Sequence, residues 1–217
     1  MRWSKLQKKN PIVDSIKKEW INLLATNNTE HAYHAFIKDH AGFFLVDRIN
    51  SFLSISKLKL GSSLETDFAV PSENHSMGLF WELFEIKTPQ ASPYNEDGFP
   101  SAILSKATQQ VRDWKAWLMD NRRGEALKLF QSKGVRVARD PNFSFTIIIG
   151  NRENSLRYLD KRNALSIESG IKIRSFEYLT NKVRLCERSE PQSNRLLDKP
   201  GLDEVSYGNS FLTCTVF

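Results

Sequence analysis

Residues 64–87 read LETDFAVPSENHSMGLFWELFEIK and contain two apolar segments separated by a polar run. The first segment carries Asp67, and the second ends in Glu85, Ile86 and Lys87. Side chains alternate between the faces of a strand, so we expect Glu85 and Lys87 on one face and Ile86 on the other. The polar run predicts a turn, and the two segments therefore predict an antiparallel hairpin that brings Asp67 beside Glu85.

Charged groups within apolar strands need partners or a chemical task, because burying a lone charge is costly. Metal-dependent phosphodiester hydrolysis is such a task. Asp and Glu oxygens suit Mg²⁺ or Mn²⁺, which polarise a phosphate and lower the pKa of a bound water. A nearby lysine then orients that water or offsets developing charge. The same residues also fit a plain cross-strand ion pair next to an unrelated aspartate, so the rest of the chain must decide.

A helix is predicted over residues 103–118, where apolar side chains recur at spacings of three and four. Gln110 falls inside this apolar stripe. A buried amide needs hydrogen-bond partners, and the nearest candidates are polar groups at the end of the Glu85 strand or water bound there. The alternative places Gln110 at the edge of the stripe, exposed to solvent.

Three motifs follow one another in the chain: LETDF at 64–68, FEIKTP at 84–89 and ATQQVRDW at 107–114. Their order and spacing resemble the PD-(D/E)xK nuclease core in its Shedu (SduA) form, a family of anti-phage defence nucleases. With weaker matches on either side, the resemblance covers residues 28–183. It implies an α/β fold of the restriction-endonuclease type, with a central mixed β-sheet flanked by helices.

The resemblance also implies roles for four residues. Asp67 and Glu85 would hold a Mg²⁺ or Mn²⁺ ion, Lys87 would assist the attacking water, and Gln110 would support the site. The implied activity is metal-dependent DNA endonuclease activity in an anti-phage defence system, and the implied assembly is a homo-oligomer, a dimer or a tetramer. The alternative is a catalytically silent module of the same fold that binds DNA ends or single strands.

Glu30 and Arg152 are further candidates for the same site. A glutamate on the opening helix approaches the metal in many nucleases of this superfamily, and Glu30 has that position here. A carboxylate in the first turn also stabilises a helix N-terminus, so both roles stay open. Arg152 departs from the family pattern because Asn151 separates it from the preceding glycine. His31 and His34, which follow Glu30 in the sequence, are interpreted as surface residues.

The bulk properties agree with a DNA-binding protein of the cytoplasm. The chain has 217 residues with a net charge of +6 and a pI near 9.3, which favours a polyanionic partner. Its two cysteines form no Cys-x-x-Cys pair and no disulfide framework, which favours a reducing compartment and no zinc site. No apolar run reaches the roughly 18 residues of a membrane span.

Three parts are predicted along the chain. Residues 1–27 form an N-terminal helical extension, whose apolar stripe either packs on the core or mediates dimerisation. Residues 28–183 form the nuclease domain, and residues 184–217 form an irregular C-terminal tail. A polar loop at 90–99 directly follows the Glu85 strand, and it either gates nucleic-acid access or is a surface insertion.

Overall fold

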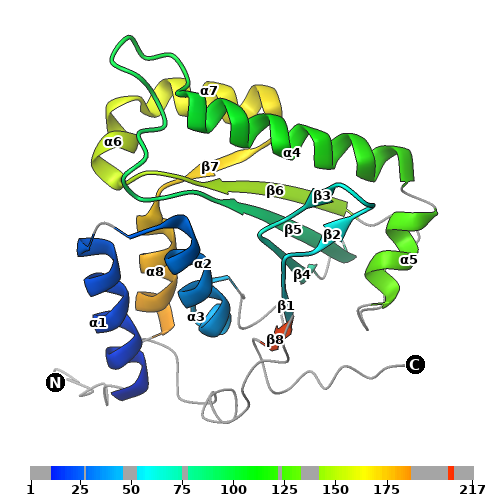
Figure 1. Ribbon diagram of the computed structural model, residues 1–217, viewed down its shortest axis with the longest axis horizontal. Coiled ribbons are helices and arrows are strands. Elements are labelled where there is room, and N and C mark those ends of the chain that lie inside the picture. The colour runs from blue at the N-terminus through cyan, green and yellow to red at the C-terminus, as the bar shows by residue number, and fades with distance from the viewer. Residues whose placement is uncertain are drawn as a thin grey trace, which may run out of the picture.

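Strand β5 (Gly78–Ile86) lies inside a six-stranded sheet with the order β7-β6-β5-β4-β1-β8 in the computed structural model (Figure 1). The structure describes residues 11–26, 28–45, 53–74, 78–121, 124–132, 142–186 and 205–207. The other strands of this sheet are β1 (Leu53–Ser56), β4 (Phe68–Asn74), β6 (Asn142–Ile148), β7 (Lys172–Arg174) and β8 (Val205–Tyr207). Two short strands, β2 (Lys59–Leu60) and β3 (Leu64–Glu65), pair separately between β1 and β4 in the chain.

The sheet is mixed, as the sequence predicts. Strands β4 and β5 pair antiparallel with Phe68 opposite Phe84, which confirms the predicted hairpin. Strands β5, β6 and β7 run parallel, so their carboxyl ends share one edge of the sheet. Asp67 directly precedes β4 and Lys87 directly follows β5, and the two therefore flank the paired ends of the hairpin.

Helices cover both faces of the sheet (Figure 1). One face carries α4 (Ala102–Asn121), α5 (Glu125–Ser132), α6 (Arg152–Arg157) and α7 (Leu159–Ser169). The opposite face carries α1 (Pro11–Ala25), α2 (Glu30–Asp39), α3 (Ala41–Phe44) and α8 (Phe176–Cys186). The predicted α/β class, with a mixed sheet flanked by helices, is confirmed.

The alternation of side chains along β5 explains why this strand is apolar almost throughout. Trp81 and Leu83 pack in the core under α4, whereas Phe84 and Ile86 pack in the core that α2 and α8 cover. A strand buried on both faces needs apolar residues at successive positions. Glu85 follows the alternation to the α4 face, and it is the charged exception in that core.

The N-terminal helix α1 packs on the body of the protein. The Trp20 indole donates a buried hydrogen bond of 2.9 Å from Nε1 to Oγ1 of Thr180 in α8, and its ring stacks on Phe176. Val13 and Ile16 belong to the same core. Of the two roles considered for this helix, packing within the chain is confirmed.

Two segments differ in detail from the expectations. The loop at 90–99 packs against α6 and α7: Tyr94 is buried next to Tyr158, whose hydroxyl donates to the carbonyl of Glu96. Within the segment expected to be an irregular tail, α8 continues to Cys186, and Val205–Tyr207 pair with β1 as an edge strand. The rest of residues 187–217 lies outside the described ranges.

Candidate active site

The end of β5 carries the carboxylate and the ammonium that the sequence places on one face. Glu85 Oε1 lies 2.7 Å from Lys87 Nζ, while the Ile86 side chain packs into the opposite core. Glu85 is only 2% exposed. A carboxylate removed from water to this extent depends on its polar neighbours, and Lys87 is the first of them.

Gln110 holds the other oxygen of the same carboxylate. Its Nε2 donates to Glu85 Oε2 at 2.9 Å, with a longer contact of 3.5 Å to the backbone carbonyl of Glu65. Helix α4 crosses the sheet face at this point because Val111 and Trp114 are buried against it. The predicted contact with the Glu85 strand is confirmed, whereas the predicted burial is only partial, because Gln110 is half-buried.

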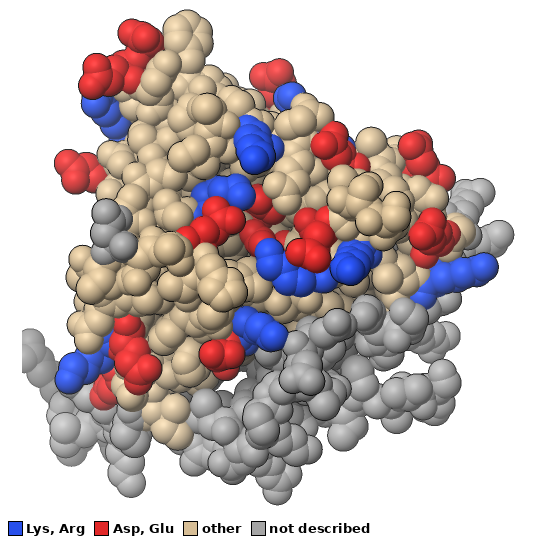
Figure 2. Space-filling view, in the orientation of Figure 1, with Lys and Arg blue, Asp and Glu red and all other residues tan. Residues whose placement is uncertain are grey.

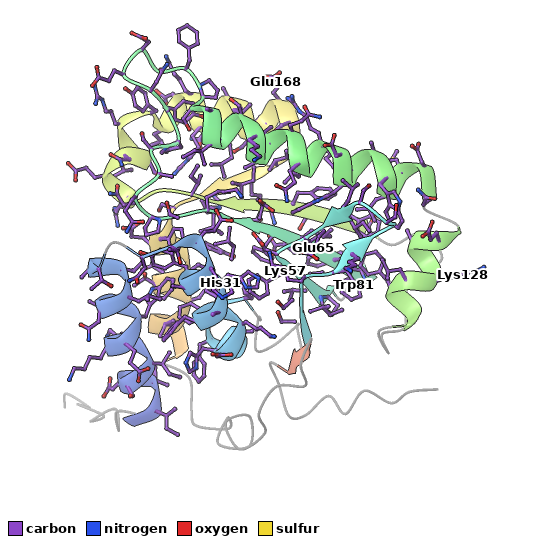
Figure 3. All side chains as sticks on the ribbon, in the orientation of Figure 1. His31, Lys57, Glu65, Trp81, Lys128 and Glu168 are labelled. Carbon is purple, nitrogen blue, oxygen red and sulfur yellow. The ribbon has the colours of Figure 1, made fainter. Side chains whose placement is uncertain are left out.

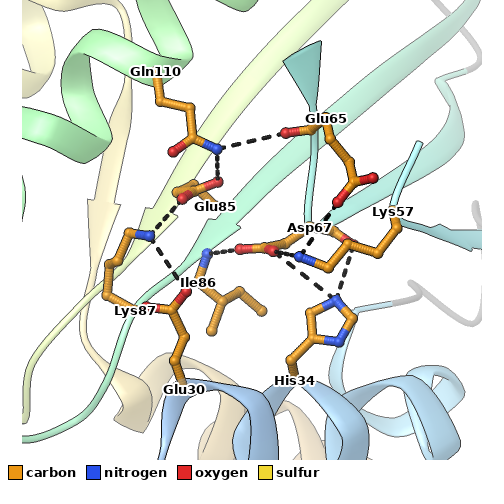
Figure 4. Close-up of polar contacts among 9 residues, drawn as sticks. All are labelled: Glu30, His34, Lys57, Glu65, Asp67, Glu85, Ile86, Lys87 and Gln110. Atoms are coloured by element: carbon orange, nitrogen blue, oxygen red, sulfur yellow. Dashed lines mark hydrogen bonds and ion pairs between the residues drawn. The ribbon is translucent and has the colours of Figure 1, made fainter. Parts of the chain in front are cut away.

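Asp67 lies next to Glu85 and is held on both of its carboxylate oxygens. The backbone N–H of Ile86 donates to Oδ2 at 2.7 Å, and Lys57 Nζ donates to Oδ1 at 2.6 Å. The backbone N–H of Asp67 donates to the Phe84 carbonyl, which joins it to β5 directly. Asp67 is 5% exposed. The structure therefore brings Asp67, Glu85, Lys87 and Gln110 into one network (Figure 4).

Helix α2 supplies two further side chains, Glu30 and His34. Glu30 Oε1 lies 3.4 Å from Lys87 Nζ, so this lysine bridges two carboxylates. The interpretation of His34 as a surface residue is wrong. It is 8% exposed, its ring stacks on Phe68, and its Nε2 lies 3.3 Å from the backbone carbonyl of Asp67. The histidine is buried because the helix turns this face toward the sheet, whereas His31 is exposed as expected.

Arg152 lies exposed on the first turn of α6, outside this network. The asparagine that separates it from the preceding glycine has a structural role of its own. Asn151 is the N-cap of α6, and its side chain accepts a hydrogen bond from the Asn154 N–H at 2.9 Å. A side chain that satisfies a free N–H at a helix start stabilises the helix.

Lys57, which follows β1 in a bend, is a residue of this network that the sequence did not predict. Strands β1 and β4 pair antiparallel with Ser56 opposite Phe68, so residue 57 falls opposite Asp67. The Lys57 N–H accordingly donates to the Asp67 carbonyl at 2.9 Å. Its ammonium also lies 3.8 Å from Oε1 of Glu65, and Figure 3 shows these two residues close together. Only a prediction of the β1–β4 pairing would have found this residue.

The electrostatics of the network are dominated by burial and by the closeness of two carboxylates. Burial, and then the charge of Asp67, raise the pKa of Glu85 to about 7 although Lys87 acts to lower it. Burial acts to lower the pKa of Lys87, but the adjacent Glu85 and Glu30 carboxylates outweigh it and raise that pKa. Burial lowers the pKa of His34, which favours the neutral imidazole beside Asp67. The network therefore has more negative than positive charge when its acids are ionised.

The charge balance fits a divalent cation. Four carboxylates, those of Glu30, Glu65, Asp67 and Glu85, face the ammonium groups of Lys57 and Lys87, which leaves two negative charges uncompensated when all are ionised. Acidic and basic side chains gather in the middle of the face in Figure 2.

Oxygen donors of this kind suit Mg²⁺ or Mn²⁺. Among the described residues, no group of three or more His, Cys, Asp or Glu side chains is arranged to hold a metal ion. Mg²⁺ keeps several waters and commonly binds through one or two carboxylates together with substrate phosphates. Asp67 and Glu85 are the residues of the network that could hold such an ion.

A protein-family model described as "Shedu protein SduA, C-terminal" matches residues 27–180, which is most of the chain. The matched span includes all the residues of the network. No curated protein matches the chain. Within the described ranges, no helix combines the length and the apolar character that crossing a membrane requires.

Proposed function

This chain belongs to the Shedu SduA family of anti-phage defence proteins, and on that premise we propose that it is a metal-dependent DNA endonuclease. The observation that carries the proposal is the buried Glu85 carboxylate. Lys87 and Gln110 contact its two oxygens, while burial and then the charge of Asp67 raise its pKa to about 7. Two carboxylates kept this close without a full set of counterions are costly for folding alone. Their arrangement is better explained by a ligand that needs both.

Asp67 and Glu85 would hold Mg²⁺ or Mn²⁺ through their carboxylate oxygens. When bound, the ion would polarise the scissile phosphate and lower the pKa of a water molecule. The protein keeps the two carboxylates in place beforehand, since the Ile86 N–H holds Oδ2 of Asp67 and Gln110 holds Oε2 of Glu85. Hydrogen bonds that orient metal ligands in this way raise both affinity and activity.

Lys87 would act on the reacting phosphate. Its ammonium lies 2.7 Å from Glu85 and 3.4 Å from Glu30, and its pKa is raised by these carboxylates, so it stays protonated at neutral pH. A fixed positive charge beside the reaction centre stabilises the negative charge that develops during phosphodiester hydrolysis, and it helps to orient the attacking water. Direct attack by water needs no covalent intermediate on the protein.

The proposed partner is DNA of phage or plasmid origin. The net charge of +6 supports a polyanionic ligand, because phosphate contacts supply most of the affinity of sequence-independent DNA binding. Assembly into a homo-oligomer, a dimer or a tetramer, is part of the proposal, since two subunits would place two sites on one duplex.

The test is incubation of the full chain with linear, circular and single-stranded DNA, in Mg²⁺, in Mn²⁺ and in a chelator. We expect cleavage only with the divalent cations. Lys87→Ala should lower kcat by about a hundredfold or more, because it removes a charge that acts in the transition state. Lys172→Ala is the matched control. Its ammonium forms an ion pair of 3.1 Å with Glu82 outside the network, so the variant should retain activity.

Two outcomes would contradict the proposal. Equal cleavage by Lys87→Ala and the parent protein would mean that the activity comes from elsewhere, provided that circular dichroism shows both folded. Salt-dependent DNA retention without cleavage under any metal condition would instead support the catalytically silent DNA-binding module.

A further inference from the structure

Lys57 has a backbone conformation that lysine rarely adopts. Its φ is +54°, in the left-handed region that glycine and asparagine tolerate better than other residues. The residue is held there because its N–H donates to the Asp67 carbonyl. A strained position that retains a long charged side chain points to a task for that side chain.

The Lys57 ammonium lies among the carboxylates that would bind the metal. Its Nζ is 2.6 Å from Oδ1 of Asp67 and 3.8 Å from Oε1 of Glu65, and the charge of Glu85 also acts on it. Oδ2 of Asp67 already accepts from a backbone N–H, so Lys57 contacts the remaining oxygen. A divalent cation that binds Oδ1 therefore competes with this ammonium for the same oxygen.

We propose that Lys57 is a built-in counterion that competes with the divalent cation for Asp67. This inference rests on the proposed function, because it assumes that Asp67 is a metal ligand. The Lys57 side chain is 49% exposed, so it can leave Asp67 for solvent without opening the core. Glu65, whose side chain is 43% exposed, offers the released ammonium another partner on the way.

The competition sets the metal concentration at which the site fills. Without a divalent cation, Lys57 compensates part of the repulsion between Asp67 and Glu85 and keeps the Asp67 carboxylate in place. The apparent affinity for the ion equals the intrinsic affinity multiplied by the fraction of molecules in which Asp67 is free of Lys57. If Lys57 occupies Asp67 about nine-tenths of the time, its removal tightens metal binding about tenfold.

The experiment measures Mn²⁺ binding to the full chain without DNA, by isothermal titration calorimetry at one pH and ionic strength. Lys57→Met and Lys57→Gln both remove the ammonium and keep most of the aliphatic stem. We expect both to bind Mn²⁺ about tenfold more tightly than the parent protein. Lys59→Met is the matched control, because it removes the same charge from an exposed residue on β2. It should bind like the parent.

Each outcome decides the inference. Equal or weaker Mn²⁺ binding by the Lys57 variants, relative to Lys59→Met, overturns the counterion role while leaving the proposed metal site intact. Absence of Mn²⁺ binding in the parent protein, unchanged in Asp67→Asn, overturns the metal site and this inference together. If Lys57→Met does not fold by circular dichroism, Lys57→Gln provides the same comparison.

Discussion

Glu85→Gln is predicted to stabilise the metal-free protein while abolishing the proposed activity. Glutamine has nearly the shape of a protonated glutamate, so the variant mimics the neutral form of the site at every pH. The pKa of Glu85 is raised from 4.5 to about 7, first by burial and then by the charge of Asp67. A carboxyl group whose pKa is raised by folding stabilises the fold below its unfolded pKa, and that stabilisation is lost as the pH rises through the folded pKa.

The size of the effect follows from this shift. For Glu85 this stabilisation is lost between pH 4.5 and pH about 7, the pKa values of the unfolded and folded states. Each pKa unit corresponds to about 1.4 kcal/mol, so the ionised carboxylate costs the metal-free fold at most about 3 kcal/mol above neutral pH. The gain of Glu85→Gln in free energy of unfolding should therefore increase by about 2 kcal/mol between pH about 5.5 and pH about 7, and then stay level.

Urea denaturation in a chelator, at several pH values across that range, measures the difference between the parent and Glu85→Gln. Glu82→Gln is the matched control. Glu82 lies on the same strand but on the other face, where it accepts from the Thr146 hydroxyl and pairs with Lys172. Because its polar partners are a hydroxyl and an ammonium, its variant should show no such gain. A difference that is flat with pH, or a variant less stable than the parent above neutral pH, would refute the reasoning.

Two further substitutions test the side chains around the carboxylates. Gln110→Ala frees one oxygen of Glu85 and should lower kcat by about tenfold, whereas Gln109→Ala, on the exposed side of the same helix, should leave kcat unchanged in a DNA cleavage assay. His34→Leu removes a buried ring and its contact with a backbone carbonyl, and it should lower the free energy of unfolding by about 1–2 kcal/mol. His31→Leu, at an exposed position, should change that free energy by less than about 0.5 kcal/mol in the same urea titration.

Local patterns in the sequence were sufficient for the hairpin and for the long helix. Alternation along β5 places Glu85 and Lys87 on one side because the strand repeat is two residues, and no distant contact is needed to establish it. The spacing of apolar residues in α4 likewise places Gln110 beside the sheet, because the stripe that contains it must face a core. We expected the end of β5 and helix α4 to meet, and the hydrogen bond between Gln110 and Glu85 agrees with this expectation.

The positions of Lys57 and His34 could not be obtained in this way. Lys57 reaches Asp67 because β1 pairs with β4 in a particular register, and short strands such as β1 leave little periodic signal in a sequence. His34 lies on a helix with apolar residues at several positions, so its periodicity alone does not say which side faces the sheet. Packing of α2 over Phe68 decides that orientation.

The amino-acid sequence by itself determined the hairpin and the helix that position the four candidate residues, since periodicity and turn residues act over a few positions along the chain. Only the tertiary structure decided which other charges surround Asp67 and Glu85, and how deeply the two carboxylates are buried. Those properties depend on strand register and on helix packing between segments distant in the sequence. The raised pKa of Glu85 and the contact between Lys57 and Asp67 arise at that level, because both require groups that become neighbours only when the chain has folded.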